Sequence, residues 1–174
     1  MIVIMRPGLV SALLATVLLV SSCSRRPPAV EQPLVQEEQA LSTLRVADPK
    51  AAAQLLNGWH EVEAGGWRWT AKQFSVAMKV PAPGKPAVLK LEFAINETLI
   101  KRLGPVALAA TANGVALPGE TYSGPGDQVY TRTVPASALT GDLVRIDFLL
   151  DKALAAGEVD QRELGVIVSA VGLQ

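Results

Sequence analysis

The three tryptophans are the residues of this sequence with the clearest binding chemistry. Trp59, Trp67 and Trp69 fall within eleven consecutive positions. A flat aromatic face that is left exposed can stack against the C–H patches of a sugar ring. Charged and imidazole side chains that can pair with sugar hydroxyls stand among them: His60, Glu61, Glu63 and Arg68. Residues 59–69 are therefore the first candidate for a carbohydrate-binding site.

A structural role is the alternative for the same tryptophans. Only 5% of the residues are aromatic, and β-sandwiches commonly bury tryptophan in their cores. In an extended strand, Trp67 and Trp69 share one face while Arg68 points to the other, so this arginine does not serve the same site as the pair directly. Whether Trp59, Trp67 and Trp69 form core or binding platform stays open at this point.

Two further segments carry candidate ligand-binding residues. Residues 121–130 (TYSGPGDQVY) are polar and glycine-rich, as expected of a loop, and loops at the ends of sandwiches often bind. They contribute Tyr122, Asp127 and Tyr130. Arg162 stands before the last predicted strand. Arg68 and Arg162 either form surface pairs with Glu63, Asp160 or Glu163, or hold a loop over the core.

Catalysis finds little support in the sequence. The chain has one histidine, His60, and no GxSxG motif for an activated serine. Asp151, Glu158 and Asp160 do not have the spacing of a calcium loop, and no zinc-ligand spacing is present. Glu61 and Glu63 have the residue types of a glycosidase pair, but a solvated strand face explains them as well. The sequence predicts no enzyme, cofactor or metal site.

Period-two patterns dominate the chain after residue 58. Alternating apolar residues predict strands over 74–80, 88–95, 106–112, 128–134, 143–150 and 163–171. Residue 88 or 89, with Leu91, Phe93 and Ile95, is expected to face inward. Asn113-Gly114 is a strong hairpin signal. Short strands between Gly/Pro turns predict a mainly β protein, a single antiparallel β-sandwich of about seven or eight strands.

A short helix is expected just before these strands. Asp48 has the residue type of an N-cap, and Pro49 suits the first helical position. Asn57-Gly58 is a stop signal. The pattern predicts a two-turn helix over 49–56 that packs Leu55 and Leu56 against the sheet.

The N-terminal residues have the features of an export signal. One positive charge, Arg6, precedes the apolar run LVSALLATVLLV at 9–20, which is too short to span a bilayer. The run ends in VSSC, which resembles the lipobox of bacterial lipoproteins. This resemblance implies cleavage before Cys23, the only cysteine, and its lipidation. The alternatives are an ordinary secreted protein or a short uncleaved anchor. Several acyl chains hold a protein firmly, because each buried methylene contributes about 0.8 kcal/mol.

The predicted mature chain starts with a tether. Residues 1–22 are assigned to the signal peptide, 23–45 to the tether, which is rich in Pro, Gln and Glu, and 46–174 to the sandwich. Cleavage leaves 15 basic and 16 acidic residues, so no nucleic-acid partner is expected. In the sorting signal of bacteria with two membranes, aspartate after the cysteine favours the inner membrane. Ser24 at this position therefore resembles the sorting signal of an outer-membrane lipoprotein.

The globular part also resembles a known kind of domain. The matching pieces are LLNGWHEVEAGGWRWT, NGVALP, VPASAL and DQRELGVIV, which together span roughly residues 55–173. They resemble a jelly-roll, carbohydrate-binding-like domain found at the C-termini of some bacterial glycosyltransferases and envelope-polysaccharide proteins. The resemblance implies the fold and a sugar-facing role, but no particular ligand, and this chain lacks a fused transferase.

The sequence thus predicts two alternative functions. The first is a non-catalytic envelope lipoprotein that binds a cell-surface or exported polysaccharide, and it predicts exposed aromatic residues beside polar groups in a concave face. The second is an accessory subunit of an envelope protein complex. It predicts an exposed apolar patch or free edge strand, with all three tryptophans buried. A third function, an envelope hydrolase, has less support from the sequence than either of these.

Overall fold

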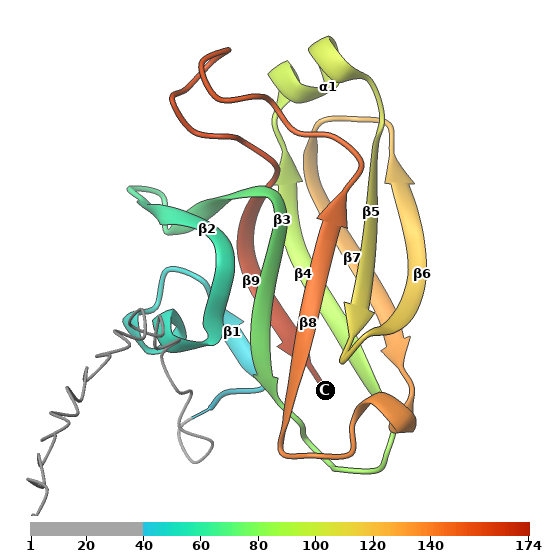
Figure 1. Ribbon diagram of the computed structural model, residues 1–174. Coiled ribbons are helices and arrows are strands. Elements are labelled where there is room, and N and C mark those ends of the chain that lie inside the picture. The colour runs from blue at the N-terminus through green and yellow to red at the C-terminus, as the bar shows by residue number, and fades with distance from the viewer. Residues whose placement is uncertain (1–39) are drawn as a thin grey trace, which may run out of the picture. The chain divides into compact units, whose positions relative to one another are not determined.

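The computed structural model describes residues 40–174 (Figure 1). Cys23, the signal peptide and most of the predicted tether lie outside these residues. Within residues 40–174, no helix is both long and apolar enough to cross a membrane. The described part contains nine strands, one α-helix and two short 3-10 helices, in the order β1 (Thr43–Arg45), η2 (Pro49–Gln54), β2 (Leu55–Glu63), β3 (Trp67–Lys79), β4 (Ala87–Ile95), α1 (Glu97–Leu103), β5 (Val106–Ala112), β6 (Val115–Tyr122), β7 (Gly126–Val134), η3 (Ala136–Ala138), β8 (Leu143–Leu150) and β9 (Ile167–Leu173).

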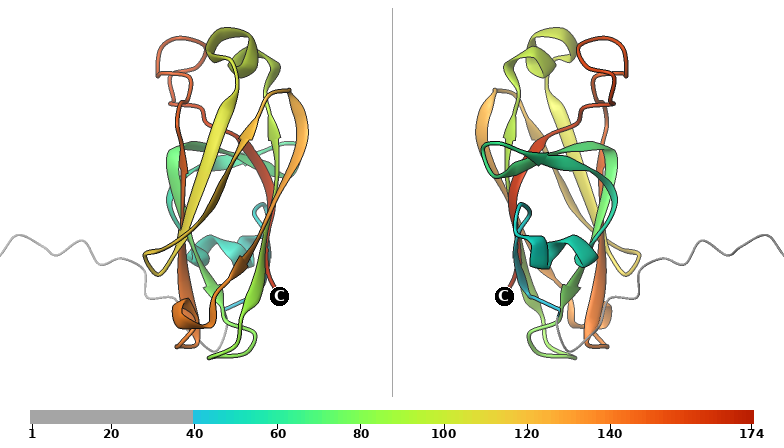
Figure 2. Two further views of the ribbon diagram at one scale, coloured as in Figure 1. Left: turned by 90° about the vertical axis from the view of Figure 1, so that its right-hand side faces the viewer. Right: turned by 90° about the vertical axis from the view of Figure 1, so that its left-hand side faces the viewer.

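The strands form a two-layered antiparallel sandwich (Figures 1 and 2). The hydrogen-bonded order is β6-β5-β8-β3-β9-β4-β7, with β1 added to β9 and β2 added to β3. The long strand β3 connects the layers: its start pairs with β9 through Arg68 and Trp69, and its later part pairs with β8 over residues 73–79. The predicted mainly β, antiparallel sandwich is confirmed, with nine strands instead of seven or eight.

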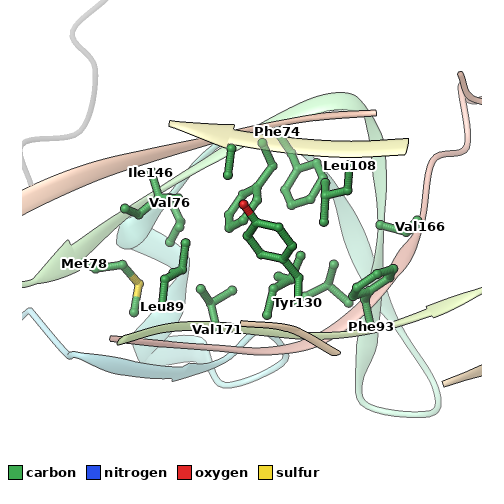
Figure 3. Packing of buried hydrophobic residues seen from close by; sticks show 14 of the residues in the cluster. Phe74, Val76, Met78, Leu89, Phe93, Leu108, Tyr130, Ile146, Val166 and Val171 are labelled. Carbon is green, nitrogen blue, oxygen red and sulfur yellow. The ribbon is translucent and has the colours of Figure 1, made fainter. Parts of the chain in front are cut away.

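Alternating apolar side chains from both layers fill the space between them (Figure 3). On β4 the residues Leu89, Leu91, Phe93 and Ile95 are buried and Val88 is exposed, so Leu89 takes the inward position. Phe74 of β3 stacks on Phe148 of β8, with ring centroids 4.8 Å apart. Burial of such large side chains supplies most of the free energy that favours folding.

The strand predictions were most accurate where alternation is regular. β5 and β8 have the predicted bounds of 106–112 and 143–150. The hairpin at Asn113-Gly114 is also confirmed, because both residues have the positive φ, 46° and 81°, that a type I′ turn requires. Strand β3 starts at Trp67, earlier than the apolar alternation indicated, because β2 and β9 pair with this stretch.

The predicted helix over 49–56 is wrong in type and length. The segment is a single 3-10 helix, Pro49–Gln54, and Leu55 and Leu56 open strand β2. Asp48 does cap it, since its Oδ1 accepts a hydrogen bond from the Lys50 backbone N–H at 2.9 Å. The helix stops early because Leu55 pairs with Val76 of β3, and Asn57-Gly58 lies inside β2 at an irregularity of its register.

The folded domain begins before residue 46. Strand β1 pairs with β9 over Thr43–Arg45, and Leu44 is fully buried. The Gln54 side chain makes two hydrogen bonds with the backbone of Leu41. It accepts one from the N–H at 2.8 Å and donates one to the carbonyl at 2.9 Å. Residues 40–45, which the sequence analysis assigned to the tether, are therefore part of the sandwich.

Candidate functional site

A groove crosses the outer face of the layer that contains β7, β4 and β9. Its volume is about 500 Å³ and it opens to solvent. The residues that line it come from four strands: Trp67, Glu92, Phe93, Ala94, Asp127, Gln128, Val129, Ile167 and Ser169. Two of them, Trp67 and Asp127, are candidates from the sequence that the fold brings to one site.

The register of the sheet sets the positions of these two residues. Asp127 of β7 pairs with Ala94 of β4, Ala94 pairs with Ile167 of β9, and Ile167 pairs with Trp69 of β3. Trp67 lies two residues from Trp69 along β3. Because neighbouring strands are about 4.8 Å apart, this row is roughly 14 Å long. Trp67 and Asp127 therefore reach the groove from β3 and β7, the outer two of its four strands, with Ala94 and Ile167 on the strands between them.

A β-bulge places Ser169 in the groove. The pairing of β4 with β9 skips this residue, since Phe93 is opposite Val168 and Glu92 is opposite Ala170. The extra residue lets Val168 and Val171 both be buried although they are three positions apart. Ser169 itself is exposed and donates to the Glu92 carbonyl at 3.3 Å. Bulges re-aim side chains in this way, often beside functional sites.

Trp67 is held in place by its own hairpin. Its ring lies edge-on to that of Trp69, with centroids 6.1 Å apart and planes at 82°. A Cβ on Gly65 would lie 2.3 Å from the Trp67 Nε1, so the hairpin needs glycine there to accommodate the indole. The half-buried ring therefore combines a fixed position with a surface turned to the groove.

The other two tryptophans serve the core. Trp69 is only 9% exposed. Trp59 packs edge-on against Phe74 at 5.2 Å, and its Nε1 donates to the Ser75 carbonyl at 2.7 Å. Both indoles pack against the core and neither lines the groove, so neither belongs to the groove site.

Tyr122 and Tyr130 do not belong to the groove site either, because both side chains are buried, at 6% and 0% exposure. The Tyr122 ring packs edge-on against Phe93 at 5.1 Å. The Tyr130 hydroxyl donates to the Pro118 carbonyl at 2.8 Å, and the Arg132 guanidinium covers its ring at 4.4 Å. Burial raises the pKa of both phenols. Residues 121–130 are mainly the ends of strands β6 and β7, which explains why the tyrosines face inward.

The polar candidates of strands β2 and β3 lie outside the groove. His60 Nε2 donates to the Glu163 carbonyl at 2.7 Å, which fixes the proton on this nitrogen. Arg68 donates to the Val46 carbonyl at 2.7 Å and to the His60 carbonyl at 2.8 Å, and so ties the N-terminal segment to β2. Glu61 is exposed to solvent. None of the three lines the groove.

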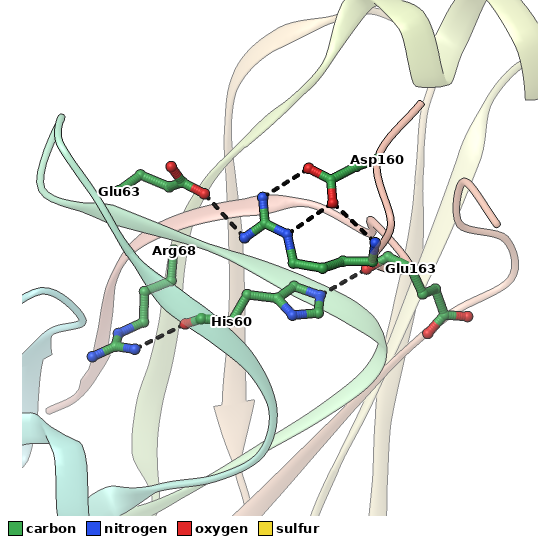
Figure 4. A network of polar contacts seen from close by, with 6 residues as sticks. His60, Glu63, Arg68, Asp160 and Glu163 are labelled. Carbon is green, nitrogen blue, oxygen red and sulfur yellow. Dashed lines mark hydrogen bonds and ion pairs between the residues drawn. The ribbon is translucent and has the colours of Figure 1, made fainter. Parts of the chain in front are cut away.

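Arg162 is the centre of a polar network between β2 and the loop before β9, and Figure 4 shows its partners Glu63 and Asp160. It donates through Nε and Nη2 to both oxygens of Asp160, each at 3.0 Å, and through Nη1 to Glu63 at 3.1 Å. The hydrogen bonds from Arg162 lower the pKa of Asp160 to about 2. The predicted surface pairing of Arg162 with Glu63 and Asp160 is confirmed, and the network holds the loop in place.

This network predicts a defined acid sensitivity. Because the pKa of Asp160 is depressed in the folded state, its stabilising effect is present above about pH 4 and is lost as the pH falls through about 2. Asp160→Asn is therefore expected to lower stability clearly at neutral pH and much less near pH 2. Urea unfolding across this range measures the effect, with Asp142→Asn as an exposed control. An equal loss at both pH values would contradict the assignment.

Among residues 40–174, no cluster of three or more His, Cys, Asp or Glu side chains is arranged to hold a metal ion. The groove residues that were not predicted from the sequence are Glu92, Phe93, Ala94, Gln128, Val129, Ile167 and Ser169. Most of them are outward-facing strand positions, and alternation marks such residues as ordinary solvent-exposed ones. Only the register, which brings the four strands together, distinguishes them.

Comparison with known proteins shows that this chain is similar to solved structures in its fold. No protein-family model and no curated protein match the chain. Among solved structures it is similar to a family GH115 4-O-methyl-alpha-glucuronidase with specificity for decorated arabinogalactans, at 10% identity and a TM-score of 0.50, over 78% of this chain and 17% of that one. It is also similar to dimeric latent PorU from Porphyromonas gingivalis, at 12% identity and a TM-score of 0.43, over 69% and 12%.

Carbohydrate-binding modules are also among the similar structures. A family 35 module from an environmental isolate matches at 9% identity and a TM-score of 0.42, over 69% of this chain and 80% of the module. The chain spans less than a fifth of PorU and of the glucuronidase. At such identities the glucuronidase match shows that a β-sandwich of this kind occurs within a larger protein.

Proposed function

We propose that this chain is a non-catalytic, lipid-anchored protein of the bacterial cell envelope that binds a cell-surface or exported polysaccharide. The groove on the outer face of β7, β4 and β9, with Trp67 in its wall, carries the proposal. It joins an aromatic surface, two carboxylates, an amide and a hydroxyl in one elongated depression. These are the groups that sugar recognition needs, because rings stack on aromatic faces and hydroxyls pair with polar groups.

The shape of the groove favours a polymer. The lining row from Asp127 over Ala94 to Ile167 crosses three strands, and its length of roughly 10 Å exceeds that of one sugar ring. The groove opens to solvent instead of forming a closed cavity, which suits a ligand longer than one sugar. Two of the side chains whose types could serve catalysis have structural partners: His60 donates to the Glu163 carbonyl, and Glu63 pairs with Arg162.

Binding to a set of purified envelope glycans tests this proposal. The full chain, in a detergent without a sugar head group, is expected to bind at least one of them, and Trp67→Ala is expected to weaken that binding about tenfold or more. Trp59→Phe is the matched control, since Trp59 lies outside the groove, and it should bind as the unchanged protein does. Absence of binding to every glycan would overturn the proposal.

The second candidate function, an accessory subunit of an envelope complex, predicts a different exposure for the Trp67 side chain. It expects all three tryptophans to be buried, whereas Trp67 is half-buried and lines a groove. This observation favours the sugar-binding function. Capture of one stoichiometric envelope protein by a chain that binds no glycan would favour the accessory subunit.

The proposal of a lipid anchor is based on the sequence VSSC at 20–23. We place the mature protein on the outer membrane, through lipid on Cys23, where the cell has two membranes. Cys23→Ser is expected to accumulate as an unlipidated precursor, because the modified thiol is lost. Metabolic labelling with a fatty acid and the size of the membrane-bound form measure this. Normal processing and release of the variant would remove the lipoprotein assignment.

A further inference from the structure

The charge of the groove indicates which polysaccharides it accepts. Its nine lining residues include two carboxylates, Glu92 and Asp127, and no lysine, arginine or histidine. Arg68 shares a register row with Phe93 and Gln128 but donates to the Val46 and His60 carbonyls. Two exposed cations lie beside the groove without lining it. Lys90 lies two residues from Glu92 along β4, and Arg45 lies on β1 opposite Ala170, which in turn pairs with Glu92.

The two carboxylates differ in their partners. Glu92 Oε1 accepts from the Lys90 ammonium at 2.6 Å, and both side chains are about half exposed. An exposed pair of this kind contributes little and exchanges partners readily. The exposed side chain of Asp127, in contrast, makes no hydrogen bond or ion pair to any side chain or backbone group of residues 40–174. Its carboxylate is therefore available to a ligand that lies in the groove.

Asp127 also lies where a bound glycan would continue. With one ring stacked on Trp67, the polymer that follows the row over Ile167 and Ala94 reaches Asp127 on β7. A protonated amine there would make a charge-assisted hydrogen bond with the carboxylate. A uronate at the same place would set two negative charges side by side, which is unfavourable.

We propose that the groove selects polysaccharides that carry free amino groups, with Asp127 as the residue that recognises the amine. This inference rests on the proposed carbohydrate-binding function. It assigns Trp67 to affinity for sugars in general and Asp127 to the choice between amino, N-acetylated and acidic sugars.

The test compares three short glycans at about pH 6 and low salt: glucosamine oligomers, the same oligomers fully N-acetylated, and oligomers of a uronic acid. The full chain is expected to bind the amino form about threefold to fivefold more tightly than the acetylated form and to bind the uronate least. Asp127→Asn should weaken amino-glycan binding about threefold to fivefold and change acetylated-glycan binding less than about twofold. Asp142→Asn, also exposed, is the matched control.

The outcomes separate the two proposals. Equal binding of amino and acetylated oligomers, tighter binding of the uronate, or an Asp127→Asn protein with unchanged preference would overturn the amine selectivity and leave sugar binding intact. Failure to bind any of these oligomers or any other envelope glycan would overturn the carbohydrate-binding function, and the selectivity with it.

Discussion

Replacing Gly58 by alanine is expected to lower the free energy of unfolding by about 4 kcal/mol, a large fraction of the stability of a typical domain. Gly58 has a φ of 73°, and a Cβ at this position would lie 2.0 Å from the Gln73 carbonyl oxygen. Both the left-handed backbone and the overlap with β3 are unfavourable, each by about 1 to 3 kcal/mol. Strand β2 would have to separate from β3 to relieve the overlap.

Gly66 provides the matched control for this prediction. Its φ of 78° is nearly the same, yet a Cβ there would meet no atom within 4 Å. Gly66→Ala is therefore expected to cost only about 1 kcal/mol, from the backbone alone. Urea unfolding of both variants measures the difference. Equal losses would show that β2 does not approach β3 at Gly58 as described.

Phe148→Ala is expected to lower the free energy of unfolding by about 3 to 5 kcal/mol. The Phe148 side chain is fully buried and stacks on Phe74, so its removal leaves a cavity between the two layers. The adjacent Leu149 lies on the opposite face of β8 and is 48% exposed. Leu149→Ala should change stability by less than about 0.5 kcal/mol. Similar losses for both variants, measured by thermal or urea unfolding, would contradict the assignment of faces on β8.

The β-sandwich could be predicted because local pattern and burial agree over most strands. Strands β5 and β8 alternate regularly, and Asn113-Gly114 has the backbone conformation that its turn requires. The short helix α1 was missed, although Asn96 caps it through a hydrogen bond to the Thr98 N–H and Gly104 ends it with a φ of 74°. Seven residues between two strands carry too little periodicity to indicate a helix.

The segments that depend on long-range pairing were predicted less well. Residues 43–45 form a strand because β9 has a free edge there, and Leu55 extends because Val76 pairs with it. Neither partner is visible in the local sequence. The same limit explains the site: aromatic and polar residue types indicated Trp67 and Asp127, but only the register of four strands places them in one groove and directs Tyr122 and Tyr130 into the core.

The indole N–H signals of the three tryptophans in a two-dimensional NMR spectrum test the central claim most directly. As a polysaccharide fragment is added to the full chain, the signal of Trp67 should shift with the amides of Asp127 and Ser169. The signals of Trp59, whose Nε1 is bonded to the Ser75 carbonyl, and of the buried Trp69 should stay largely in place. Glycan binding that leaves Trp67 unmoved, or that instead shifts Ala109 and Leu149 on the opposite layer, would contradict the account.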